Sequence, residues 1–153
     1  MRIIKVIFVI LKFIASDLAQ AADPINSSTF GSVAIDGYDT VAYWTENKAV
    51  EGTKKFTYVW KDVKWRFVSE ANMNLFKADP GKYIPQYGGY CAWAMSDGKR
   101  ASVDGDAWTM HEGKLYLNYN KSVMKEWRAD KETFIPQADD WYPKVVDLQA
   151  IAC

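Results

Sequence analysis

The chain has few of the residues that most often build metal centres and covalent crosslinks, because its 153 residues include only two cysteines and one histidine. This supply cannot make a four-ligand zinc site from His and Cys alone, nor a disulfide framework. The 19 Lys and Arg are balanced by 19 Asp and Glu. This balance predicts no nucleic acid as a partner, since phosphate binding needs an excess of cationic side chains.

Aromatic residues, in contrast, are abundant. Trp, Tyr and Phe make up 15% of the chain, hydrophobic residues 49% and charged residues 25%. These proportions are typical of a globular domain, and the length suits one domain without internal repeats.

The first residues predict an export signal. Arg2 gives a basic start, residues 3–15 are mostly apolar, and residues 19–21 (AQA) have the small-x-small pattern of a signal-peptidase site. The apolar run is shorter than the roughly 20 residues that a spanning helix needs, so we expect no stable membrane span, with an uncleaved anchor as the alternative. We therefore expect residues 1–21 to be a signal peptide and the protein to be periplasmic or secreted. Residues 22–32 are expected to be a flexible lead-in.

Alternating residue patterns predict two β-hairpins. Residues 56–60 and 63–67 alternate aromatic or β-branched side chains with polar ones around Lys61-Asp62. Residues 108–111 and 114–118 flank a second turn, Glu112-Gly113.

Short helices are predicted between and after the hairpins. Ser69 is the expected N-cap of a helix that ends at Asp79-Pro80, and Asn120 that of a helix over residues 121–129. Phe134-Ile135 begins a further short helix or turn. We therefore predict the α+β class: a small antiparallel sheet built from hairpins, with short helices packed on it, in a single domain over residues 33–143. Residues 144–153 are expected to be a C-terminal tail.

Several of these segments resemble the YHS domain family. The similarity lies in residues 36–39 (DGYD), in the hairpin ending Arg66-Phe67 and in the helix ending at residues 75–80 (LFKADP). Residues 87–92 (YGGYCA) and 115–121 (LYLNYNK) resemble the exported bacterial branch of that family. The resemblance implies that this domain handles a metal ion.

The chain is a cysteine-poor variant of the family pattern. Family members often carry a Phe-Cys-Ser-x-x-Cys run where the hairpin meets the helix, and the corresponding residues here are 67–72 (FVSEAN). Val68 and Asn72 therefore stand at the thiol positions, and the soft ligands that select copper or zinc are absent there. Cys91 is the main residue left on which a metal site could depend.

Cys91 follows paired glycines in an aromatic-rich loop. It could be a buried apolar residue, a metal ligand together with His111, or a reactive thiol with His111 or Asp39 as its partner. His111 lies near the tip of the second hairpin, where a single histidine is more often solvated. Cys153 could pair with Cys91 or crosslink two chains.

A set of aromatic residues and one carboxylate could line a pocket for a flat or sugar-like ligand, or the aromatics could simply form the core. The carboxylate, Asp39, could instead cap the helical turn that follows it. The predicted ligand-binding residues are Tyr38, Asp39, Tyr43, Tyr87, Tyr90 and Trp93.

The leading hypothesis is a small exported binding protein for a metal ion, copper favoured, or for a small molecule. No catalysis is assigned to it. One alternative is a thiol-dependent enzyme or redox protein that uses Cys91. The other is a structural or interaction module.

Overall fold

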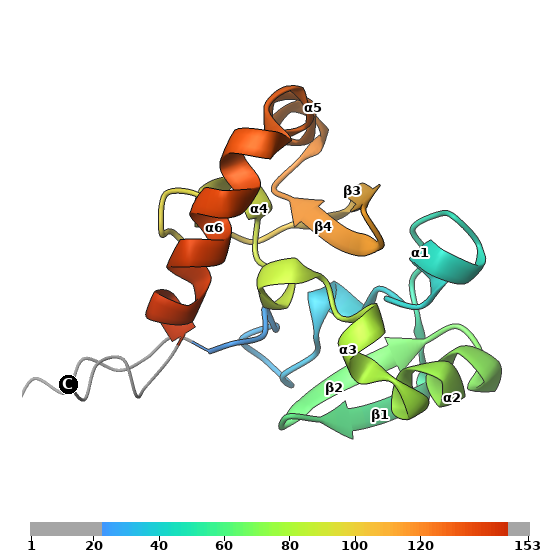
Figure 1. The fold of residues 1–153 in the computed structure, drawn as a ribbon. Coiled ribbons are helices and arrows are strands. Elements are labelled where there is room, and N and C mark those ends of the chain that lie inside the picture. The colour runs from blue at the N-terminus through green and yellow to red at the C-terminus, as the bar shows by residue number, and fades with distance from the viewer. Residues whose placement is uncertain (1–22, 147–153) are drawn as a thin grey trace, which may run out of the picture.

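Hairpins and short helices alternate along the chain (Figure 1). The computed structural model describes residues 23–146, so the predicted signal peptide and residues 147–153 lie outside the described part. The α+β prediction is confirmed. In chain order the elements are η1 (Ile35–Gly37), α1 (Ala42–Thr45), β1 (Thr53–Trp60), β2 (Val63–Phe67), α2 (Glu70–Ala78), α3 (Pro80–Tyr83), η2 (Gln86–Gly89), α4 (Ala92–Met95), β3 (Asp104–His111), β4 (Lys114–Asn118), α5 (Lys121–Ala129) and α6 (Lys131–Val146).

The two predicted hairpins form two separate antiparallel sheets of two strands each, β1–β2 and β3–β4. Lys61 and Asp62 form the first turn with φ angles of 50° and 59°. This left-handed pair matches the twist of the flanking strands. Both ladders contain an irregularity, between Thr53 and Thr57 in β1 and between Asp104 and Trp108 in β3. The second hairpin therefore begins four residues before the predicted start at Trp108.

The first hairpin packs against α2 through aromatic rings. Phe76 of α2 is fully buried, and its ring centroid lies 4.9 Å from that of Trp65 and 5.2 Å from that of Phe67. The Ser69 hydroxyl accepts a hydrogen bond from the Asn72 backbone N–H at 3.1 Å, as expected of an N-cap. Burial of one such ring stabilises the fold by about 1.5–3 kcal/mol.

A second cluster packs between the β3–β4 hairpin and helices α4, α5 and α6 (Figure 1). Tyr116 of β4 and Trp127 of α5 are its largest buried members, with ring centroids 5.0 Å apart. The predicted Asn120 cap is confirmed, since its side-chain oxygen accepts from the Val123 N–H at 2.8 Å.

Helix α6 is much longer than the short helix or turn predicted around Phe134-Ile135. It runs from Lys131 to Val146 with two prolines inside, and it includes the first residues of the predicted tail. Each proline removes one helical hydrogen bond. Ala138 is fully buried in the second cluster, and Phe134, Ile135, Tyr142 and Val145 pack against that cluster.

The start of the described chain, part of the predicted lead-in of residues 22–32, is packed against the domain. Ile25 is only 4% exposed, and the Asn26 backbone N–H donates to the Gly88 carbonyl at 2.9 Å. The Ser28 N–H donates to the Val33 carbonyl at 2.9 Å. The segment folds back onto the domain and its polar groups bond within it.

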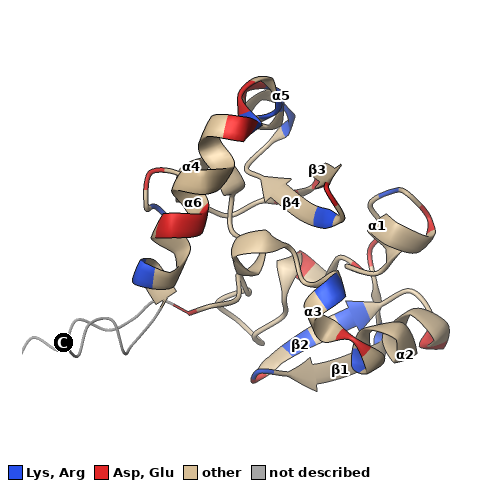
Figure 2. Cartoon of the chain, viewed as in Figure 1, with Lys and Arg blue, Asp and Glu red and all other residues tan. Residues whose placement is uncertain are grey.

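Acidic and basic residues are interspersed over the described fold (Figure 2). None of the described helices combines the length and the apolar character that crossing a membrane requires.

Candidate functional site

The backbone at η2 is unusual, as it is at η1, where Ile35, Asp36 and Gly37 have consecutive positive φ angles of 49°, 51° and 86°. Tyr87, Gly88 and Gly89 have consecutive positive φ angles of 60°, 61° and 85°. A bulky residue such as tyrosine rarely adopts this conformation, and such strain concentrates at functional sites. Long-range contacts hold it in place: the Asn26 backbone N–H donates to the Gly88 carbonyl, and the Asn26 side-chain amide donates to the Gly89 carbonyl at 3.1 Å.

The backbone at Gly88 also leaves no room for a side chain. A Cβ atom there would overlap the Pro24 carbonyl oxygen and would lie 3.1 Å from the Tyr142 hydroxyl oxygen. That hydroxyl donates to the same Pro24 carbonyl at 2.7 Å. Residues far apart in sequence are thus brought together around η2.

The Tyr87 side chain forms a polar contact with α6. Its hydroxyl donates to the Asp139 carboxylate oxygen Oδ1 at 2.9 Å and lies 3.4 Å from the Ile135 carbonyl oxygen. Burial, and then the hydrogen bond to Asp139, raise the pKa of Tyr87. Tyr87 therefore stays protonated at neutral pH and acts as a donor that fixes the orientation of the Asp139 carboxylate.

A pocket of about 440 Å³ opens beside this contact, where α3, η2, β4 and α6 meet. Its volume lies within the range of small-molecule sites. We call it the Tyr87 pocket. It is lined by Gly81, Ile84, Pro85, Gln86, Tyr87, Gly88, Lys114, Asp139, Tyr142 and Pro143.

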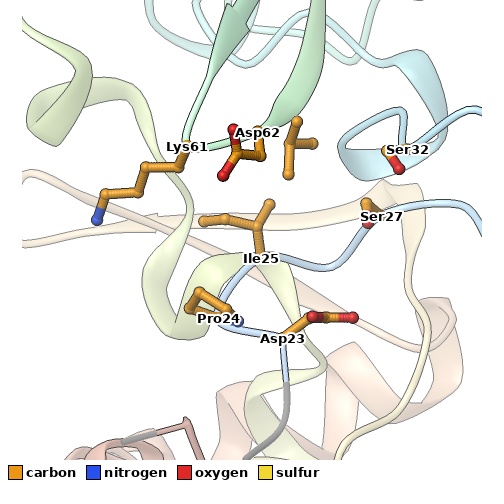
Figure 3. A pocket seen from close by; sticks show the side chains of 8 residues that line it. Asp23, Pro24, Ile25, Ser27, Ser32, Lys61 and Asp62 are labelled. Atoms are coloured by element: carbon orange, nitrogen blue, oxygen red, sulfur yellow. The ribbon is translucent and has the colours of Figure 1, made fainter. Parts of the chain in front are cut away.

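A second pocket of about 450 Å³ lies between the start of the described chain and the β1–β2 turn. Figure 3 shows Ile25 and Pro24 facing Asp62 across it, while the Lys61 side chain extends away. None of the predicted site residues lines it, which makes it the weaker candidate. Its lining residues are Asp23, Pro24, Ile25, Ser27, Ser32, Lys61, Asp62 and Val63.

The six predicted ligand-binding residues do not gather in one pocket. Of these six, Tyr87 alone lines the pocket named after it. Tyr43 is fully buried, and its hydroxyl donates to the Gly105 carbonyl at 2.7 Å. The Tyr38 ring packs directly on Gly105, where an added Cβ would lie 2.6 Å from it. Tyr43 therefore packs in the interior, as the alternative of an aromatic core predicted, whereas Tyr38 is half-buried and packs against the core.

Tyr90 and Trp93 also lie outside that pocket. The Tyr90 hydroxyl donates to the Asp23 carbonyl at 2.9 Å, and the Arg100 guanidinium lies 5.7 Å from the Tyr90 ring centroid. Trp93 is 42% exposed on α4. The set was predicted from residue type and closeness in sequence, and the loop turns these side chains in different directions.

Asp39 is a structural carboxylate, as the capping alternative predicted. It is completely buried, and Oδ1 accepts from the Val41 and Ala42 backbone N–H groups at 2.8 and 3.1 Å. Oδ2 accepts from the Val68 N–H at 2.9 Å and from the Asn72 side-chain amide at 2.8 Å. Val68 and Asn72 stand where the family resemblance places thiols. At this junction between β2 and α2, both residues donate hydrogen bonds to Asp39.

Cys91 and His111 are not brought together, which removes the predicted metal-ligand pair and the predicted catalytic pair. The buried Cys91 sulfur lies 3.5 Å from the Asn118 side-chain oxygen at one end of β4. His111 pairs with Lys114 at the other end of that strand, which is roughly 13 Å away for four residues of strand. The His111 Nε2 atom lies instead 3.7 Å from a Glu132 carboxylate oxygen.

No group of three or more His, Cys, Asp or Glu side chains within residues 23–146 is arranged to hold a metal ion. The copper expectation therefore has no site among these residues. Cys153, the other thiol, lies outside the described residues.

Comparisons of the chain with protein-family models, with curated proteins and with solved structures give no match. The resemblance to YHS domains stays a prediction.

The sequence pointed to part of the Tyr87 pocket. The paired glycines drew attention to residues 87–92, but Lys114, Asp139 and Tyr142 were missed. A signal for two of these was present, because Ile135, Asp139 and Tyr142 have the i, i+4, i+7 spacing of one helix face. The two prolines in that segment obscured it.

Proposed function

We propose that this chain is a small exported binding domain without catalytic activity, and that a small molecule binds in the Tyr87 pocket. The observation that carries this proposal is the left-handed Tyr87, whose hydroxyl is fixed on Asp139 at the edge of a concave site. A strained backbone supported by several long-range contacts is typical of a site that must hold its groups in one geometry. Export is supported by the signal-like pattern of residues 1–21.

The surroundings of the reactive groups favour binding over catalysis. The Cys91 thiol is 1% exposed and contacts an amide, so neither a substrate nor a base reaches it in this conformation. The Tyr87 hydroxyl is engaged as a hydrogen-bond donor to Asp139. Small-molecule binding is favoured over copper, because residues 23–146 offer a pocket but no ligand cluster for a metal.

The test adds a side chain at a residue that lines the pocket, without straining the backbone. Gly81 lines the pocket, and the nearest atom to an added Cβ there is an Asp79 carboxylate oxygen at 3.9 Å. Gly81→Leu would add a side chain at this lining position and would favour helix formation in α3. Ala78→Leu, on the exposed surface of α2, adds a similar side chain outside the pocket and serves as the control.

The purified protein would be titrated with a fragment library and with Cu(II), and the backbone amide signals followed by NMR. We expect fragments to shift the amides of Gln86, Lys114 and Asp139, and we expect Gly81→Leu, but not Ala78→Leu, to abolish these shifts. The proposal fails if no fragment perturbs these amides or if Gly81→Leu leaves the shifts unchanged. Saturable copper binding that is lost in Cys91→Ala would instead support the metal hypothesis.

A further inference from the structure

We infer that the Tyr87 pocket selects small zwitterions, molecules such as free amino acids that carry both an ammonium and a carboxylate. This inference rests on the proposed function and names the class of its ligand. It comes from two lining side chains of opposite charge, Lys114 and Asp139, which do not form an ion pair with each other. Both side chains are exposed, and each can bind a ligand group of the opposite charge.

Asp139 has an oxygen left for a ligand. Oδ1 accepts the Tyr87 hydroxyl, while no side chain or backbone group within residues 23–146 donates to Oδ2. The nearest cation along the same helix, Lys144, is bound to the neighbouring Asp140 at 2.7 Å. An ionised carboxylate has about four lone-pair positions, so the ammonium group of a ligand can take those that Tyr87 leaves.

Lys114 lines the pocket from the β3–β4 hairpin, and its side chain is exposed. It begins β4 and lies on the same strand face as Tyr116, because residues two apart in a strand point the same way. The Tyr116 ring centroid lies 6.0 Å from that of Tyr87, so this face is turned towards η2 and α6. Within residues 23–146, no carboxylate forms an ion pair with the exposed Lys114 ammonium, so its three N–H donors are accessible to a ligand carboxylate.

The remaining wall supplies apolar contact. Ile84, Pro85 and Pro143 lie in the lining together with the Tyr142 ring, next to the two charged groups. A ligand with a single charge would be attracted by one of the two groups and repelled by the other. A zwitterion is attracted by both, so the same pair of residues provides affinity and excludes singly charged competitors.

The experiment compares ligands and protein variants that each lack one charge. Glycine, L-leucine and L-phenylalanine would be titrated by NMR or calorimetry, followed by leucinamide, N-acetyl-leucine and glucose. We expect free amino acids to bind, and removal of either ligand charge to weaken binding by about tenfold or more, since a charged hydrogen bond is worth about 1.5–3 kcal/mol.

Two substitutions identify which residue binds the ligand carboxylate and which binds the ligand ammonium. Lys114→Gln should abolish the preference for leucine over leucinamide, and Asp139→Asn should abolish the preference for leucine over N-acetyl-leucine. Asparagine keeps an oxygen for the Tyr87 hydroxyl, so this variant removes the charge while a hydrogen bond to Tyr87 remains possible. Lys125→Gln and Glu126→Gln, exposed residues outside the pocket, are the controls and should change neither preference.

The inference is overturned if none of the three amino acids binds, or if glucose or leucinamide binds to the wild-type pocket as tightly as leucine. In either case the proposed function still stands when Gly81→Leu removes the binding of some other fragment. If no fragment binds in a manner sensitive to Gly81→Leu, both proposals fail.

Discussion

Replacing Gly88 with alanine should lower the free energy of unfolding by about 3–4 kcal/mol. An L-residue at a φ of +61° costs about 1–2 kcal/mol relative to glycine. The new methyl group would displace the Pro24 carbonyl, which accepts the Tyr142 hydroxyl, and would disturb the Asn26–Gly88 bond beside it. Each lost hydrogen bond adds about 1 kcal/mol.

Gly113→Ala is the matched control. Gly113 also has a positive φ, of 72°, but nothing lies within 4 Å of an added Cβ, so only the conformational cost applies. Urea unfolding followed by tryptophan fluorescence would measure both variants. For a chain of this length, 1 kcal/mol corresponds to about 2–4 °C in melting temperature, so Gly88→Ala should melt roughly 10 °C lower than wild type. Equal destabilisation by the two variants would refute the steric reasoning at Gly88.

Further predictions concern buried groups. Asp39→Asn should cost about 3 kcal/mol or more in urea unfolding, because the new amide NH₂ would face donors that now bond to the carboxylate, and wild-type stability would contradict the network. Burial raises the pKa of Tyr116 to about 12, above the value of 10.0 for an exposed tyrosine, so the folded state retains a proton that the unfolded chain releases. The free energy of unfolding should therefore fall as the pH rises from about 10 to about 12, and Tyr116→Phe should reduce this fall. If Tyr116→Phe leaves the pH dependence of the free energy of unfolding unchanged, Tyr116 does not contribute to it. In a Cys153→Ser background, the buried Cys91 thiol should react with a thiol reagent far more slowly in the folded protein than in urea, whereas equal rates would favour the reactive-thiol alternative.

Features set by adjacent residues could be predicted from the sequence. The Ser69 and Asn120 caps and the turn at Lys61-Asp62 depend on side chains within three residues of each other. The paired apolar patterns of the strands defined the hairpins for the same reason. These local signals were sufficient for the α+β class and for the starts of α2 and α5.

The site depends on contacts that no local pattern encodes. The Asn26 amide meets Gly89 across 63 positions, and the Tyr142 hydroxyl meets Pro24 across 118. Residue type also did not show which aromatic residues line the pocket. Tyr43 and Tyr87 are both buried and hydrogen-bonded, but of these two only Tyr87 lines it. Distinguishing them requires the path of the chain in three dimensions.

The bond between Tyr142 and Pro24 has a consequence for the order in which the protein can fold. A ribosome delivers the chain from its N-terminus, so Pro24 leaves the ribosome long before Tyr142 does. At about 5–20 residues per second, the 118 positions between them take several seconds or more to synthesise. During that interval the first packed segment, including the apolar Ile25, lacks its partner on α6. The Tyr87 pocket cannot form until nearly the entire domain has been made.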